Sequence, residues 1–181
     1  MHDDEVDVLV FERFVRRAQW EFTQGSTERA ADNLSRAQRL WRGPMLSNVP
    51  IGGVLTGRTA HLDELRIRAL ELRVEVENRL GRYREFLPEL RSLVNDHPLH
   101  EWFHGQLISA LHLAGRRGEA LQAYQNLYDI LKRELGLEPS DEVQRLQFEI
   151  LNTSAADTPR RRTGTSAGSG ITALWASVAT G

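Results

Sequence analysis

The 181-residue sequence contains no cysteine. This absence excludes a disulfide framework, cysteine-ligated zinc and thiol catalysis, and it fits a protein of the reducing cytoplasm. No apolar run is long enough to span a membrane. No apolar stretch follows the acidic residues 3–5 either, so the sequence does not indicate a signal peptide. We therefore expect a cytoplasmic protein.

The sequence also lacks an excess of either charge, because 23 Lys and Arg residues stand against 25 Asp and Glu residues. A chain that coats nucleic acid by electrostatic attraction would carry a basic surplus. The arginine-rich stretch 66–84 is interleaved with acidic residues, which is typical of a solvated helix of mixed charge. Sustained alternation of apolar and polar residues, the pattern of half-buried strands, is missing as well. What remains is helical spacing.

Glycine-centred turns recur with a regular period. Gly81 and Gly115 lie 34 residues apart, and each is followed five positions later by an apolar residue, Phe86 or Ala120. A 34-residue period of helix, glycine turn and helix is that of tetratricopeptide arrays. Because each helix pair in such an array buries its apolar face by stacking on its neighbours, the pattern predicts a docking scaffold.

A diverged copy of the same unit stands nearer the start of the chain. Gly25 precedes Ala30 by the same five positions. Trp41 lies on the apolar stripe of the helix that follows, so we favour a core role for it over that of an exposed partner anchor. The distance from Gly25 to Gly81 exceeds one period by 22 residues, which predicts an insertion, an irregular loop over about residues 44–57.

The last part of the array predicts an end cap. Tyr124 occupies the aromatic packing position of its repeat, whereas Tyr128, on an adjoining stripe, is open between core and surface. Ser140 is the expected N-cap of a final helix that covers the end of the array. The fold class is thus all-α: a tetratricopeptide-like stack of about three antiparallel helix pairs plus a capping C-terminal helix. We place this domain at residues 6–152 and expect a flexible tail at 153–181.

Several ordered motifs carry a family resemblance. They include residues 40–46 (LWRGPML), 114–116 (AGR) and 134–140 (ELGLEPS). Over roughly residues 6–151 the sequence resembles the bacterial transcriptional activator domain of the Streptomyces antibiotic regulatory protein (SARP) family. The resemblance implies a tetratricopeptide-like module that follows a winged-helix DNA-binding domain. In the family this module helps to activate transcription by self-association or by contact with the transcription machinery.

The sequence departs from the family where the winged helix should stand, because only five residues precede Val6. We therefore expect no sequence-specific promoter binding by this chain alone. A fragment, a misplaced start codon and a short regulator that acts through a partner all remain open. The expected partner is RNA polymerase or another regulator chain, a second copy included, with DNA engaged only indirectly and no membrane contact. We expect it to dock in a groove lined by the first helix of each pair.

Residues 100–104 (HEWFH) formally match a zinc-protease motif, in which His100 and His104 would hold zinc and Glu101 would act as general base. The match falls in the first turn after Pro98, and no third ligand stands at a recognisable spacing. We favour two surface histidines over this metallopeptidase reading, and we expect a protein that is not an enzyme. A generic tetratricopeptide adaptor is the other alternative, against which the 40–46 and 134–140 motifs argue.

The tail offers two further motifs. Residues 164–174 faintly resemble a phosphate-binding loop, but Ile171 stands where the lysine is required. The arginines at 160–162 would give only weak, salt-sensitive contacts with phosphates or an acidic partner. We assign no catalytic, metal or cofactor-binding residue and no cofactor. The residues singled out are those of the repeat turns and their packing: Gly25, Ala30, Trp41, Gly81, Phe86, Gly115, Ala120 and Tyr124.

Overall fold

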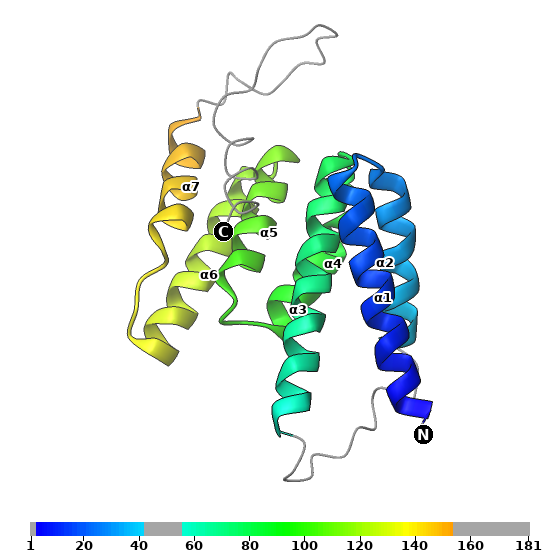
Figure 1. Ribbon diagram of the computed structural model, residues 1–181. Helices are drawn as coiled ribbons and strands as arrows, with labels where there is room; N and C mark the ends of the chain where they lie inside the picture. Colours follow the sequence, from blue (N-terminus) through cyan, green and yellow to red (C-terminus); the bar gives the residue numbers. More distant parts are fainter. Residues whose placement is uncertain (1–2, 42–55, 154–181) are drawn as a thin grey trace, which may run out of the picture. The chain divides into compact units, whose positions relative to one another are not determined.

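The computed structural model describes the backbone of residues 3–41 and 56–153, and the side chains of 8–40 and 61–153. These residues form seven α-helices and no strand (Figure 1). The all-α prediction is therefore confirmed. The helices are α1 (Asp3–Thr23), α2 (Thr27–Trp41), α3 (Thr56–Arg79), α4 (Tyr83–Asp96), α5 (Glu101–Leu113), α6 (Arg117–Leu135) and α7 (Asp141–Asn152).

The chain divides into two compact units, Met1–Asp96 with α1 to α4 and His97–Gly181 with α5 to α7. In the first unit, α1 and α2 form a closely packed pair, α3 packs against both, and α4 packs against α3. Its core is built from residues at helical spacing, many of them small, so that the helix backbones approach closely. Two clusters of this core contain Phe11, Val15, Ala18, Ala30, Ala31, Leu34, Ala37, Ala69, Leu72 and Val76.

In the second unit, α5 pairs with α6, and α7 packs against both. Phe103 is fully buried at the centre, and Tyr124 is buried while Tyr128 is half-buried. The apolar stripe of α7 (Val143, Leu146 and Ile150) is buried, so the final helix covers apolar surface of the preceding pair as an end cap does. Two further core positions, in α5 and α6, are Leu107 and Leu127.

The three glycine turns share one backbone geometry. Gly25, Gly81 and Gly115 have φ values of +77°, +73° and +77°, a left-handed conformation that favours glycine. In each turn the glycine N–H donates to the carbonyl three residues earlier, and the next N–H donates to the carbonyl five residues before it. This pair of hydrogen bonds satisfies the last carbonyls of the helix and stops it. Gly136 ends α6 in the same left-handed conformation, with a φ of +68°.

The residue five positions after each turn glycine is buried. Ala30, Phe86 and Ala120 occupy equivalent places in the first turn of α2, α4 and α6. The N–H of each donates to the carbonyl four residues earlier, which is the residue directly after the glycine. One sequence signature thus produces the same stop, turn and restart three times along the chain.

Some expectations fall where the structure gives no side-chain description. Trp41 is the last residue of α2, and its side chain lies outside the described residues. The proposed loop at 44–57 overlaps α3, which begins at Thr56, and the rest of that loop lies outside the described residues. Almost all of the tail also lies outside the described residues. This includes the arginines at 160–162 and residues 164–174, which faintly resemble a phosphate-binding loop.

Candidate protein-interaction surface

The HEWFH segment starts α5, and its second histidine is not on the surface. His104 is only 4% exposed, which corrects the expectation of two surface histidines. Its Nε2 lies 3.0 Å from the carbonyl oxygen of Pro98, and because a carbonyl only accepts, this nitrogen donates. Burial lowers the pKa of His104, although the Pro98 hydrogen bond opposes this shift. The structure therefore favours a neutral imidazole, whose hydrogen bond to Pro98 stabilises the start of α5.

The other two groups of the motif are also engaged within the fold. The His100 ring stacks on Phe103, with 4.2 Å between ring centroids. Glu101 accepts a hydrogen bond from the backbone N–H of Ser140 at 2.7 Å. In the described ranges, no three His, Asp or Glu side chains gather where they could hold a metal ion. These contacts support a structural role for the segment.

Ser140 precedes α7 as expected, but its side chain makes no capping hydrogen bond. The predicted N-cap position is therefore confirmed, but the Ser140 hydroxyl does not bond to the first turn of the helix. The Glu101 carboxylate from α5 accepts a hydrogen bond from the Ser140 N–H instead. This contact lies at the N-terminal end of α7, where the helix dipole favours a negative charge. Sequence reasoning missed this contact because the two residues lie 39 positions apart.

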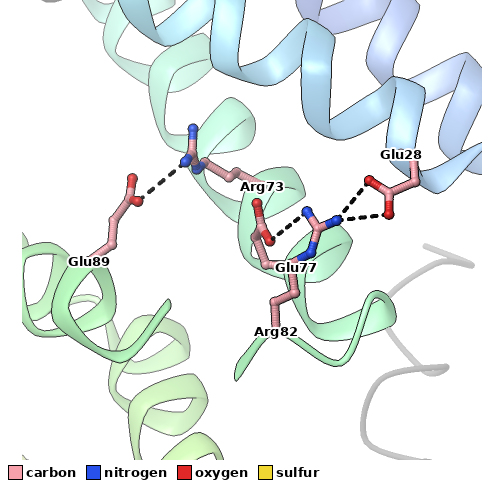
Figure 2. Close-up of polar contacts among 5 residues, drawn as sticks. All are labelled: Glu28, Arg73, Glu77, Arg82 and Glu89. Carbon is pink, nitrogen blue, oxygen red and sulfur yellow. Dashed lines mark hydrogen bonds and ion pairs between the residues drawn. The ribbon is translucent and has the colours of Figure 1, made fainter. Parts of the chain in front are cut away.

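Ion pairs connect the helices of the Met1–Asp96 unit (Figure 2). Arg82, just after the Gly81 turn, binds both carboxylate oxygens of Glu28 on α2, at 2.8 and 2.9 Å. It also lies 3.8 Å from Glu77 on α3. The Arg82 and Glu28 side chains are 44% and 69% exposed, so water and salt screen this pair and its contribution to stability is small.

A second arginine lies deeper. Arg73 on α3 pairs with Glu89 on α4 at 3.3 Å (Figure 2). Their side chains are only 18% and 25% exposed. Gln38 on α2 joins them, because it accepts from Arg73 and donates to Glu89 at 2.9 Å. The sequence predicted a solvated mixed-charge helix here, which is wrong for Arg73. This residue links three helices of the unit.

Two grooves stand out in the described part of the chain. One, of about 250 Å³, lies between α5 and α7 and is lined in part by Trp102, Gly105 and Leu146. The other, of about 480 Å³, lies between α1 and α2 and carries a concentration of arginine. We call the second one the arginine groove; its lining is Arg13, Phe14, Arg17, Glu21, Arg29, Asp32, Asn33 and Arg36.

The groove expected along the first helix of each pair would involve α1, α3 and α5, which belong to both units. The structure describes each unit by itself, so that groove stays a prediction. No helix in the described residues is both long enough and apolar enough to cross a membrane.

Three helix pairs joined by the same glycine turn, with a seventh helix packed on the last pair, define a tetratricopeptide-like scaffold. Sequence comparison then identifies the family. The chain belongs to the bacterial transcriptional activator domain family, whose model matches residues 6–151, and it is of the SARP type.

The relatives are regulators of transcription. The chain is 40% identical over 145 residues to the regulatory protein DnrI of Streptomyces peucetius, and the match covers 80% of this chain and 53% of DnrI. It is 37% identical over 127 residues to the regulatory protein AfsR of Streptomyces coelicolor, covering 70% of this chain and 13% of AfsR. The chain thus spans about half of DnrI and a small part of AfsR.

A solved structure shares the fold. Mycobacterium tuberculosis EmbR, in complex with a low-affinity phosphopeptide, superposes with a TM-score of 0.73 at 30% sequence identity. The match covers 83% of this chain and 40% of EmbR. The tetratricopeptide-like prediction is therefore confirmed.

Proposed function

We propose that this chain is a regulatory module that contributes to transcriptional activation through protein–protein contact. The observation that carries the proposal is the family match over residues 6–151, a range that includes almost all of the seven described helices. Relatives that share this region are named as regulators. A helical-repeat scaffold acts by presenting surface to a partner, which suits a role without chemistry of its own.

The proposed partner is RNA polymerase or another regulator chain, a second copy of this one included. EmbR, whose chain contains this fold, is in complex with a phosphopeptide, which supports a protein partner in general. Because this chain matches only 40% of EmbR, that contact supports no particular site here. Promoter recognition is proposed to come from a DNA-binding domain outside residues 6–151. The site of action is then the cytoplasm.

Affinity capture tests the proposal. The purified chain, immobilised at one end, is expected to retain purified RNA polymerase holoenzyme from a Streptomyces, or a second copy of itself. A tetratricopeptide protein of similar size and charge from an unrelated pathway serves as the control bait. Equal capture by both baits would show that retention reflects only a sticky helical surface. Absence of capture of both polymerase and self would contradict the proposal.

A further inference from the structure

The arginine groove is built by side chains spaced three or four residues apart on two adjacent helices. Arg13, Arg17 and Glu21 follow one face of α1, and Arg29 and Arg36 follow the facing side of α2. Because the two helices are joined by the tight Gly25 turn, they run antiparallel. Glu21 and Arg29 therefore lie near the turn, and Arg13 and Arg36 lie toward the other end.

The floor of the groove is polar and internally satisfied. Glu21 is only 3% exposed, and its two carboxylate oxygens accept hydrogen bonds from Asn33 at 2.6 Å and from Arg17 at 3.2 Å. Asn33 also donates to the Arg29 carbonyl at 3.2 Å. A buried carboxylate is held at low cost when its oxygens are bonded in this way. The charge of Glu21 is thereby already engaged by Arg17.

The remaining arginines are not engaged. Arg13, Arg29 and Arg36 are exposed and form no ion pair with any side chain of the described ranges, and Asp32 is the one further carboxylate in the lining. Elsewhere in the same unit, Arg68, Arg73 and Arg82 do have carboxylate partners. The groove therefore concentrates uncompensated positive charge in a chain whose formal net charge is −2.

We propose that the arginine groove binds an acidic peptide segment of a protein partner. Guanidinium groups bind carboxylates through two parallel hydrogen bonds, and they lose less hydration than ammonium groups when they do so. The stretch of α1 from Arg13 to Glu21 rises about 12 Å, which about four extended residues can span. Half-buried Phe14 adds an apolar contact in the lining. The fitting ligand is thus a short segment that places two or three carboxylates around an apolar side chain.

Nucleic acid fits this site less well. The Glu21 and Asp32 carboxylates line the same groove and would repel a continuous row of phosphates. Separate carboxylates on a peptide can instead be placed opposite the arginines and away from these two acids. The inference deepens the proposed function, on which it rests for the presence of a protein partner, by naming the surface and the chemistry of that partner.

Fluorescence anisotropy with a defined probe tests the inference. The probe is a fluorescein-labelled peptide of about eight residues, with Asp and Glu around a central Leu, and its control replaces each acid by the corresponding amide. The full chain is compared with the double variant Arg13→Gln/Arg36→Gln. The matched control variant, Arg68→Gln/Arg84→Gln, removes the same charge from exposed positions of the same unit outside the groove. Circular dichroism checks that both variants remain helical.

The expected result is that the acidic probe binds and the amide probe does not. The groove variant should weaken binding about tenfold at about 50 mM NaCl, while the control variant should stay within about twofold of the parent. Equal weakening in both variants would assign binding to net charge and overturn the proposal. Displacement of the probe by short duplex DNA, with the same dependence on Arg13 and Arg36, would assign the groove to nucleic acid and also overturn it.

The two proposals fail separately. Capture of polymerase that is unchanged in the groove variant, with no peptide binding, would overturn the groove inference and leave the proposed function standing. Groove-dependent peptide binding without capture of polymerase or self would support the groove and contradict the proposed function.

Discussion

At the scale of single residues, the glycines show how backbone conformation determines which amino acid a position accepts. Gly115 has a φ of +77°, and an added Cβ would meet no atom within 4 Å. Gly118, three residues later in the first turn of α6, also has open space around it but no positive φ. The two glycines therefore differ in backbone conformation and not in crowding.

Substitution to alanine should have opposite effects at these two positions. Gly115→Ala is expected to lower the free energy of unfolding by about 1–2 kcal/mol, because a left-handed conformation strains any residue with a Cβ. Gly118→Ala should raise it by up to about 0.5 kcal/mol, because alanine favours the helix. Urea unfolding followed by circular dichroism measures both. Equal changes of the same sign would show that the turn geometry is wrong.

A second residue-scale prediction concerns His104. Burial lowers the pKa of His104 in the folded chain, so the unfolded chain takes up the proton first as the pH falls. Neutral His104 therefore contributes its full stabilisation above the pKa of histidine in the unfolded chain, about 6.5, and this contribution is lost as the pH falls below that pKa. His104→Gln keeps an N–H that can donate to Pro98 but does not titrate. Unfolding midpoints between pH 7 and pH 5 should therefore fall less in the variant. Unfolding midpoints that fall equally with pH in the variant and the parent would contradict this prediction.

At the scale of helices, the hydrogen bond at the start of α7 comes from another element. Glu101 on α5 accepts from the Ser140 N–H at 2.7 Å, whereas the Ser140 hydroxyl makes no capping bond. Ser140 as the expected N-cap was enough to predict where α7 begins. The hydrogen bond that Glu101 accepts from this N-cap residue was not predictable, because it depends on which helix packs beside α7 in the folded unit.

The hydrogen bond between Glu101 and Ser140 predicts that substitution of Glu101 lowers stability more than substitution of Ser140. Glu101→Ala is expected to cost about 1 kcal/mol of stability, since it removes the partner of a helix-terminal N–H and a favourable charge. Ser140→Ala should cost only a few tenths of a kcal/mol, although serine at an N-cap is worth more than this in most helices. Thermal unfolding of the two variants compares them directly. A larger loss of stability in Ser140→Ala than in Glu101→Ala would show that the Ser140 hydroxyl caps α7.

The arginines of α3 and the Gly81 turn show why exposure decides the value of an ion pair. Arg73→Ala leaves the Glu89 carboxylate without its cation and the Gln38 side-chain oxygen without its donor in a partly buried site, and should cost about 1–3 kcal/mol. Arg82→Ala removes an exposed pair with Glu28 and a longer contact, at 3.8 Å, with the less exposed Glu77, and should cost less than about 1 kcal/mol. Denaturant unfolding ranks the two. Equal costs would show that the Arg73 pair is as well hydrated as the Arg82 pair.

At the scale of the whole molecule, the repeat determined how much was predictable. A 34-residue period and three glycines spaced five residues from a buried position are local signals, so the sequence indicated the helices, their turns and the fold class. The burial of His104 and the Arg73–Glu89 pair depend on side chains from separate helices meeting, which periodicity does not encode. The arginine groove was missed for the same reason, since its charges come from two helices that each look ordinary.

The last prediction concerns DNA. The described helices carry carboxylates among their arginines, and the whole chain has a formal net charge of −2, so it lacks the basic surplus that holds a duplex. In a mobility-shift assay, the isolated chain should bind promoter and scrambled duplexes equally weakly, and salt above about 0.15 M should abolish that binding. Fusion to an unrelated DNA-binding domain should still raise transcription from the matching promoter, because activation is proposed to need only protein contact. A sharp, salt-resistant shift with one promoter would place sequence recognition in this chain and remove the need for a separate DNA-binding domain.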